Sequence, residues 1–199
     1  MLTNMDDEEP VTSPAALRLR ALAHPLRWKL FDIVFREGTA TATRCAELTG
    51  ESVASCSYHL NILGKYRYLE PVPGSGKPGS GKEKPWRSIS TRQDMSPPGP
   101  ELEDRLASEA ATEAFLEHEF DRLRSWWRLR DNEPGDWRKA TGLGGVTTWV
   151  TVEELQQMHD ELWSVLQRYT DRSDNPSLRP SGSRAARTFF FTAVSPPQR

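Results

Sequence analysis

The chain has 199 residues, of which 36% are hydrophobic and 27% are charged, and its formal net charge is −2. No apolar run approaches the roughly 18 residues that a membrane-spanning helix needs. The acidic segment 1–10 also lacks the basic and apolar blocks of a signal peptide. We therefore expect a cytoplasmic protein with no membrane partner.

The charge is unevenly distributed along the chain. Residues 11–92 hold 13 Lys/Arg and 6 Asp/Glu, a balance of +7. Residues 100–199 hold 13 Lys/Arg and 17 Asp/Glu, a balance of −4. A basic half followed by an acidic half indicates that only the first half meets polyanions.

The first elements follow a helix–break–helix pattern. Residues 1–13 are typical of a disordered acidic tail, and Ser13-Pro14 is typical of a helix start. This helix should reach Ala23 and end at His24-Pro25, because a residue before proline avoids helical backbone. Apolar spacing predicts a second helix from 25 to about 36, which Gly38 ends.

Two short helices are predicted next. Thr41 or Thr43 caps a helix over 44–49, Gly50 provides the turn, and Ser52 caps a helix that reaches about Lys65. The inward positions of this last helix are predicted to be Val53 or Cys56, then Leu60 and Leu63.

A basic hairpin is predicted to follow. Residues 68–72 and 86–90 are typical of strands, and a Gly/Ser/Lys-rich loop over 73–85 joins them. Helices and hairpin in this order are what a winged helix-turn-helix needs to place one helix in the major groove of DNA. We assign this domain to residues 14–95.

The remainder, 100–199, is predicted to be a helical dimerisation region with a small β element. It would hold a helix over 101–130, an irregular stretch over 132–145, a strand over 147–150, a helix from the capping box 151–154 to about Asp171, and a strand over 188–194. The length of the first helix indicates a pairing surface. Its apolar positions are Leu102, Leu106, Ala110, Ala114, Leu116, Phe120, Leu123 and Trp127. The whole chain is thus predicted to be mainly α (α+β).

The helix that starts after Ser52 has an outer face of small or hydrogen-bonding residues without a carboxylate, which suits a DNA groove. We expect Ser57, Tyr58 and Asn61 to touch bases or nearby phosphates, while His59 either contacts phosphate or packs. Basic residues around this helix would hold phosphates and make binding salt-dependent. The full predicted DNA-binding set is Arg44, Ser52, Ala54, Ser55, Ser57, Tyr58, His59, Asn61, Lys65, Lys77, Lys82, Lys84 and Arg87.

Three segments carry a resemblance to a known family. LRALAHPLRWKLFDIV, CAELTGESVASCSYHLNIL and KYRYLEPV resemble the ArsR-type winged-helix transcriptional regulators, most closely actinobacterial members that lack metal motifs. The resemblance covers residues 15–92. It implies that the helix 52–63 enters the major groove and that the hairpin 68–90 is the wing. It further implies a homodimer built from 15–23 and 101–130.

Two positions depart from that family. Metal-sensing members carry Cys-x-Cys where this chain has Arg44-Cys45-Ala46, and one thiol cannot make that site. We therefore expect no metal and no cofactor, and Cys45 and Cys56 to be reduced, buried thiols. Arg67 stands where many relatives have a glycine, so it either adopts a positive φ or the helix ends differently.

These patterns predict a homodimeric, sequence-specific transcriptional repressor that binds a pseudo-palindromic operator in double-stranded DNA. Two alternatives remain open: a protein-interaction module built on a degenerate winged helix, and a regulator that senses a small-molecule effector in an aromatic C-terminal pocket. The residues for such a pocket are Trp126, Trp127, Trp137, Trp149 and Trp163. A further alternative, an enzyme hidden in the C-terminal half, would require a polar pocket with perturbed acids or bases; no nucleophile–base pair or carboxylate dyad stands out for it, so an enzyme is not expected.

Overall fold

The computed structural model describes residues 12–73, 83–89 and 95–194. The protein is mainly helical with a small two-stranded antiparallel sheet, which confirms the predicted α+β class. It divides into two compact units, residues 1–124 and 125–199, and the boundary falls within the long helix α5 (Leu102–Leu129). Of the predicted acidic tail, residues 1–11 lie outside the described ranges.

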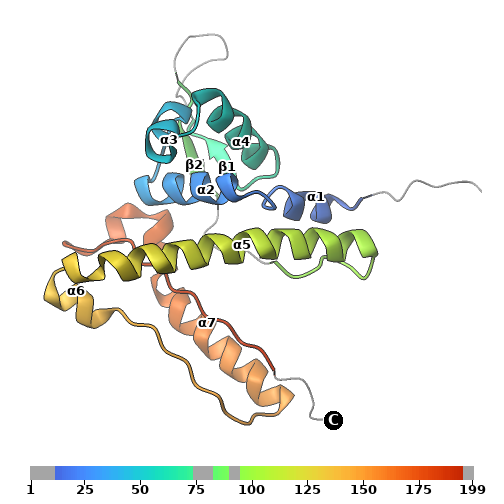
Figure 1. Ribbon diagram of the computed structural model, residues 1–199, viewed down its shortest axis with the longest axis vertical. Helices are drawn as coiled ribbons and strands as arrows, with labels where there is room; N and C mark the ends of the chain where they lie inside the picture. Colours follow the sequence, from blue (N-terminus) through green and yellow to red (C-terminus); the bar gives the residue numbers. More distant parts are fainter. Residues whose placement is uncertain (1–11, 74–82, 90–94, 195–199) are drawn as a thin grey trace, which may run out of the picture. The chain divides into compact units, whose positions relative to one another are not determined.

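The first unit contains four short helices, a hairpin and most of α5 (Figure 1). Before α5, its elements are α1 (Pro14–Arg20), α2 (Pro25–Glu37), α3 (Ala42–Thr49), α4 (Val53–Lys65), β1 (Leu69–Pro71) and β2 (Trp86–Ser88).

Local capping residues set the limits of these helices. The hydroxyls of Ser13, Thr41 and Ser52 accept backbone N–H bonds at the starts of α1, α3 and α4, so Thr41, and not Thr43, is the cap of α3. Gly38 and Gly50 end α2 and α3 with φ of 77° and 78°, which glycine adopts without strain. Helix α1 ends at Arg20, three residues earlier than predicted.

Helix α2 lies in the middle of this unit. In Figure 1, α3, α4 and the strands lie on one side of α2, and α5 lies on the other. Leu30 and Val34 are completely buried there, and Trp28 is 2% exposed. An element that packs on two sides buries apolar residues on both, which is consistent with the six buried hydrophobic residues of α2.

The hairpin is fastened to the helices at Trp86. Leu69 pairs with Ser88 and Pro71 with Trp86, and Ala40 forms an additional bridge to Trp86 through two backbone hydrogen bonds of 2.8 and 3.0 Å. The indole also covers α4 at Gly64, where an added Cβ would lie 2.4 Å from the ring. The hairpin can therefore pack against α4 because this position has no side chain.

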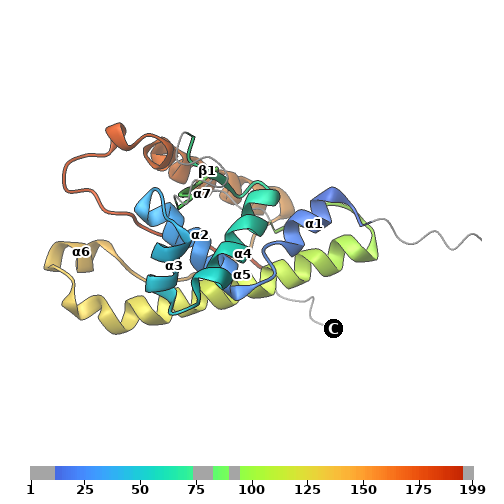
Figure 2. The ribbon, with the colours of Figure 1, turned by 90° about the horizontal axis from the view of Figure 1, so that it is seen from above.

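Helix α5 packs against α1 and α2. Figures 1 and 2 both show α1 running beside α5, and the Ser13 hydroxyl donates a 2.8 Å hydrogen bond to Asp104. Farther along, Arg122 pairs with Asp32, and Phe115 packs on Trp28 with ring centroids 5.1 Å apart. The face of α5 that this contact buries is lined by small residues. These include Ala107, Ser108, Ala111 and Ala114.

The predicted apolar face of α5 is largely a different one. Leu102, Leu106, Phe120 and Trp127 are between 45% and 61% exposed. Spacing alone could not separate the two faces, because small alanines and large apolar residues alternate around this helix. The large residues thus remain on the outside of the described structure.

The second unit contains the end of α5, η1 (Arg130–Asn132), α6 (Gly135–Ala140), α7 (Val152–Asp174) and η2 (Pro176–Leu178). The capping box at Thr151 and Glu154 is confirmed. Helix α6 was missed, because Pro134-Gly135 is typical of an irregular segment. In the parts of the chain that are described, no helix combines the length and the apolarity needed to cross a membrane.

The predicted C-terminal β element is wrong. Residues 147–150 and 188–194 form no strand, and the only sheet in the described ranges is β1–β2. Their β-branched and aromatic residues fit a strand only when a neighbouring strand covers them. Here Phe190 packs on Trp163 instead, with ring centroids 5.3 Å apart, so side-chain packing on α7 replaces strand pairing.

Arg67 takes the positive φ that its position suggested, with φ 60° directly after α4. Left-handed backbone costs a residue with a Cβ roughly 1–2 kcal/mol, whereas glycine tolerates it. We expect Arg67→Gly to raise the free energy of unfolding by about 0.5–1 kcal/mol, after the extra chain entropy of glycine is subtracted. Urea unfolding measures this change. Lys65→Gly, in the last helical position of α4, is the matched control and should lower the free energy of unfolding. If both variants lower it, the backbone at Arg67 is not strained.

Candidate nucleic-acid interface

Helix α4 is held firmly by its inner face. Cys56, Leu60 and Leu63 are completely buried, so Cys56, and not Val53, is the first inward position; Val53 is 47% exposed. The Ser52 hydroxyl accepts the Ser55 N–H at 3.1 Å and fixes the start of the helix. Because buried contacts hold one side, the other side is presented in one fixed orientation.

The outer face of α4 is polar and contains no carboxylate. Ser52, Ala54 and Asn61 are exposed, Ser55 and Ser57 are half-buried, and the helix has no Asp or Glu. Tyr58 projects farthest, with 63% of its surface exposed. The Asn61 amide nitrogen donates to the Ser57 carbonyl at 2.8 Å. This face therefore offers hydroxyl groups and one amide to a partner, without a negative charge.

His59 lies on the inner side of this helix. It is 9% exposed, and its Nδ1 accepts a 3.2 Å hydrogen bond from the Arg27 guanidinium. Arg27 also donates to the Ala21 carbonyl at 2.7 Å, and the His24 ring lies 4.4 Å from the His59 ring. Of the two roles left open for His59, the structure thus shows packing.

Arg27 was not singled out in the sequence. It joins α2 to the chain just after α1 and to α4 through one guanidinium group. No local pattern could have indicated this, because its partners are 6 and 32 residues away.

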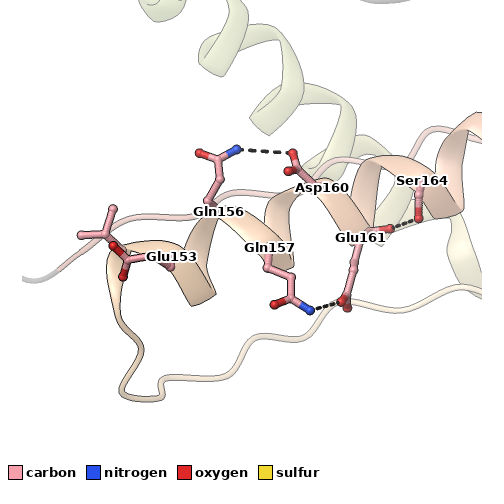
Figure 3. Close-up of a pocket in the computed structure, with 7 residues that line it drawn as sticks. Glu153, Gln156, Gln157, Asp160, Glu161 and Ser164 are labelled. Carbon is pink, nitrogen blue, oxygen red and sulfur yellow. Dashed lines mark hydrogen bonds between the residues drawn. The ribbon is translucent and has the colours of Figure 1, made fainter.

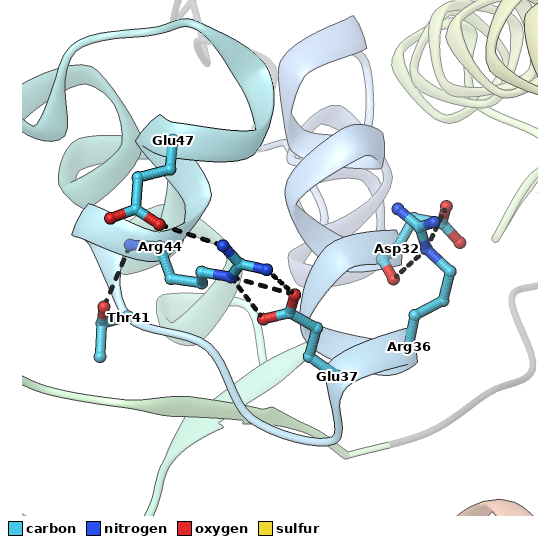
Figure 4. Close-up of polar contacts among 6 residues, drawn as sticks. All are labelled: Asp32, Arg36, Glu37, Thr41, Arg44 and Glu47. Atoms are coloured by element: carbon cyan, nitrogen blue, oxygen red, sulfur yellow. Dashed lines mark hydrogen bonds and ion pairs between the residues drawn. The ribbon is translucent and has the colours of Figure 1, made fainter.

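Arg44 does not project freely toward a partner. Its guanidinium pairs with Glu37 at 2.8 Å and with Glu47 at 3.1 Å (Figure 4). These contacts raise the pKa of Arg44, and the hydrogen bond from Arg44 lowers the pKa of Glu37. A phosphate would have to compete with two carboxylates for this cation.

The other predicted cations have contacts of their own. Arg87 pairs with Glu70 across the hairpin at 2.6 Å. The Lys84 amine lies 4.0 Å from the Trp86 ring centroid, and the Lys65 amine lies 5.3 Å from that of Tyr66. An aromatic ring leaves the positive charge of a lysine without a neutralising counter-charge, whereas a carboxylate in an ion pair neutralises the cation. Lys77 and Lys82 lie outside the described residues.

Both cysteines are completely buried and free, as predicted. Burial, followed by the nearby Cys56 thiol, raises the pKa of Cys45 to about 12. A thiol in that state is a poor metal ligand, because metals bind the thiolate. Among the described residues no group of three or more His, Cys, Asp or Glu side chains is placed to hold a metal ion.

The tryptophans of the second unit do not line the depression that the structure shows there. That depression, of about 660 Å³, lies along α7 and is lined mainly by polar residues: Val152, Glu153, Gln156, Gln157, Asp160, Glu161 and Ser164 (Figure 3). Trp126 contacts Trp127, Trp137 contacts Arg184, and Trp163 contacts Phe190. Trp149 is 96% exposed. Trp126, Trp137 and Trp163 therefore belong to separate contacts.

Comparison of this chain with models of known protein families and with curated protein sequences finds no match.

The contact between His24 and His59 should make stability depend on pH. Burial is the main cause that lowers the pKa of both His24 and His59 below 6.5, and Arg27 lowers both further. The unfolded chain then binds protons more readily, so this stabilisation is complete above about pH 6.5 and is lost as the pH falls below it. We expect the free energy of unfolding to fall between pH of about 7 and 5.

His59→Gln tests this origin. Glutamine can still accept the Arg27 hydrogen bond but does not titrate. Urea unfolding at several pH values should show a shallower dependence in the variant than in the wild type. An unchanged slope would show that the dependence has another source.

Proposed function

We propose that residues 14–95 form a winged helix-turn-helix domain and that this chain is a sequence-specific DNA-binding transcriptional regulator, a repressor that acts as a homodimer in the cytoplasm. The observation that carries this proposal is the two-sided character of α4. One side of it is completely buried, and the other presents Tyr58, Ser57 and Asn61 without a carboxylate. A fixed helix with such a face suits the major groove.

The hairpin supports the same proposal. It follows α4 directly, and Trp86 packs on Gly64 of that helix. Lys84 precedes β2 of this hairpin, and Lys65 ends α4. Both lysines lie against aromatic rings, which leave their positive charge without a neutralising counter-charge, so both suit phosphates beside the groove that α4 enters.

The homodimer would use α1 and α5. Leu17 on α1 is 37% exposed, and Leu102 and Leu106 on α5 are 61% and 45% exposed. Because α1 and α5 lie side by side, these leucines supply apolar surface from adjacent helices. A two-fold axis there would repeat α4 at two half-sites of a pseudo-palindromic operator.

One observation favours a second candidate, a protein-interaction module on the same face. Arg44 and Arg87 both pair with carboxylates of the same unit. Each pairing lowers the positive potential at that arginine, while the balance of +7 already counts the carboxylates involved. A protein partner would bind the Tyr58 face without the salt dependence that phosphate contacts impose.

A mobility-shift titration distinguishes the two. We expect the wild type to bind a duplex from upstream of its own coding region more tightly than random duplex. Ser57→Ala with Tyr58→Ala should reduce that preference by about 1–3 kcal/mol for each base that the variant no longer touches. Trp149→Ala, which removes an exposed aromatic residue from the second unit, is the control and should bind as the wild type does. Equal affinity for upstream and random duplex would overturn the proposal that this chain is a sequence-specific regulator.

Releasing Arg44 should strengthen DNA binding. Glu37→Gln removes the carboxylate that lies closest to the guanidinium, so Arg44 becomes available to a phosphate. We expect tighter binding at low salt, and a slope of log K against log salt that is steeper by about 0.9 for each additional phosphate neutralised. Glu133→Gln, whose partner Arg184 lies in the second unit, makes the same change in charge and serves as control. Equal increases in affinity for both variants would mean that net charge alone is responsible.

A further inference from the structure

Helix α7 carries a regular apolar stripe that faces outward. Its residues alternate at spacings of three and four, the pattern of positions a and d in a heptad repeat. They are Leu155, Met158, Leu162, Val165 and Tyr169. We call these five residues the α7 seam. Over 15 residues, at 1.5 Å per residue, the seam is about 21 Å long.

The seam is much more exposed than an apolar helix face that packs inside its own unit. Met158 is 37% exposed, Leu162 39%, Val165 44% and Tyr169 54%. Leu155 is half-buried. A continuous apolar stripe left in water marks an interaction surface more often than isolated exposed residues do.

The chain's own C-terminal segment covers a neighbouring part of α7. Phe190 packs on His159 and Trp163, with ring centroids 5.7 and 5.3 Å away. The Trp163 indole donates a 3.1 Å hydrogen bond to His159, which links the two rings that Phe190 contacts. The segment that packs on α7 therefore lies beside the seam, and the last four seam residues keep their exposure in its presence.

Charges beside the seam indicate which partner fits it. When Leu155 is position a, the g positions are Glu154, Glu161 and Arg168, and all three are exposed. In a parallel pair of identical helices, g positions meet e positions, so Glu161 would face Leu166 and Arg168 would face Ser173. Glu154 would face His159, and neither Glu161 nor Arg168 would meet an opposite charge.

An antiparallel pair brings opposite charges together. When Leu162 of one copy faces Val165 of the other, Met158 faces Tyr169, and g positions meet g positions. Glu161 of each copy then lies beside Arg168 of the other, which gives two symmetric ion pairs. Figure 3 shows Glu161 on the helix surface, where Gln157 donates to it at 2.9 Å. A carboxylate retains acceptor capacity for a second donor.

We propose that the α7 seam binds the same seam of a second copy of this chain, in antiparallel orientation. The contact buries Met158, Leu162, Val165 and Tyr169 of each copy and sets its register through Glu161 and Arg168. It goes beyond the proposed regulator and its dimer on α1 and α5, because it uses a separate surface in the second unit. One copy can thus offer two distinct surfaces to its neighbours.

Sedimentation equilibrium of the full chain tests the contact. We expect Leu162→Asp to weaken self-association by about tenfold or more, since a charge would be buried between two apolar stripes. Gln156→Asp adds the same charge to the polar side of α7 and should leave association unchanged. Circular dichroism of both variants establishes that α7 still folds.

A charge exchange tests the orientation. Glu161→Arg and Arg168→Glu should each weaken association, because like charges then meet, and the double variant should restore it. A wild type that stays monomeric at all concentrations overturns the proposal, as does a Leu162→Asp variant that associates like the wild type. Failure of the double variant to recover overturns the antiparallel register. Because α4 is unchanged in all these variants, the DNA titration reports on the regulator separately.

Discussion

The burial of α2 on both sides is the constraint on which the first unit depends. Leu30 and Val34 are completely shielded from water, and Trp28 nearly so, because α3, α4 and the hairpin pack on one side of α2, while Phe115 and Arg122 of α5 contact the other. Apart from α5, each of those elements is short, and a short helix or hairpin is marginal by itself in water. Their stability comes from the apolar surface that they share with α2, so the exposed face of α4 exists only because α2 holds its reverse side.

Local contacts of the arginines determine where positive charge is available around α4. The balance of +7 over residues 11–92 already counts the carboxylates that pair with Arg44 and Arg87, whereas Arg27 is held by the neutral His59 ring and the Ala21 carbonyl. Such pairs on an exposed surface contribute little to stability, but they lower the positive potential available to an anion. Around α4, Lys65 and Lys84 lie beside aromatic rings and Arg67 is exposed directly after the helix, so affinity for a polyanion would be sensitive to salt.

Local signals allowed much of the fold to be predicted. Ser13, Ser52 and Thr151 cap helices where the sequence placed them, and His24-Pro25 separates α1 from α2. These signals act within a few residues, so a sequence shows them directly. The prediction of strands over 147–150 and 188–194 was wrong, because a strand forms only when a neighbouring strand pairs with it.

The candidate site was predictable in outline but not in its charges. Cys56, Leu60 and Leu63 follow helical spacing, so the outer face of α4 could be derived. His59 lies three residues after Cys56 and four before Leu63, so helical spacing also places it on the inner side, where it packs against Arg27 and His24. The pairing of Arg44 with Glu37 depends on how the Gly38 turn directs the chain between two helices, which local spacing does not encode.

Arg27 has a mechanical consequence for the first unit. Its planar guanidinium is bonded at one nitrogen to the carbonyl of Ala21, beside the end of α1, and at another to His59 of α4. The length of one guanidinium group therefore limits how far these two places can separate, and neither can shift alone without losing a charged hydrogen bond. Arg27 therefore couples the end of α1 to α4, and a displacement at either place would be transmitted to the other through this one side chain.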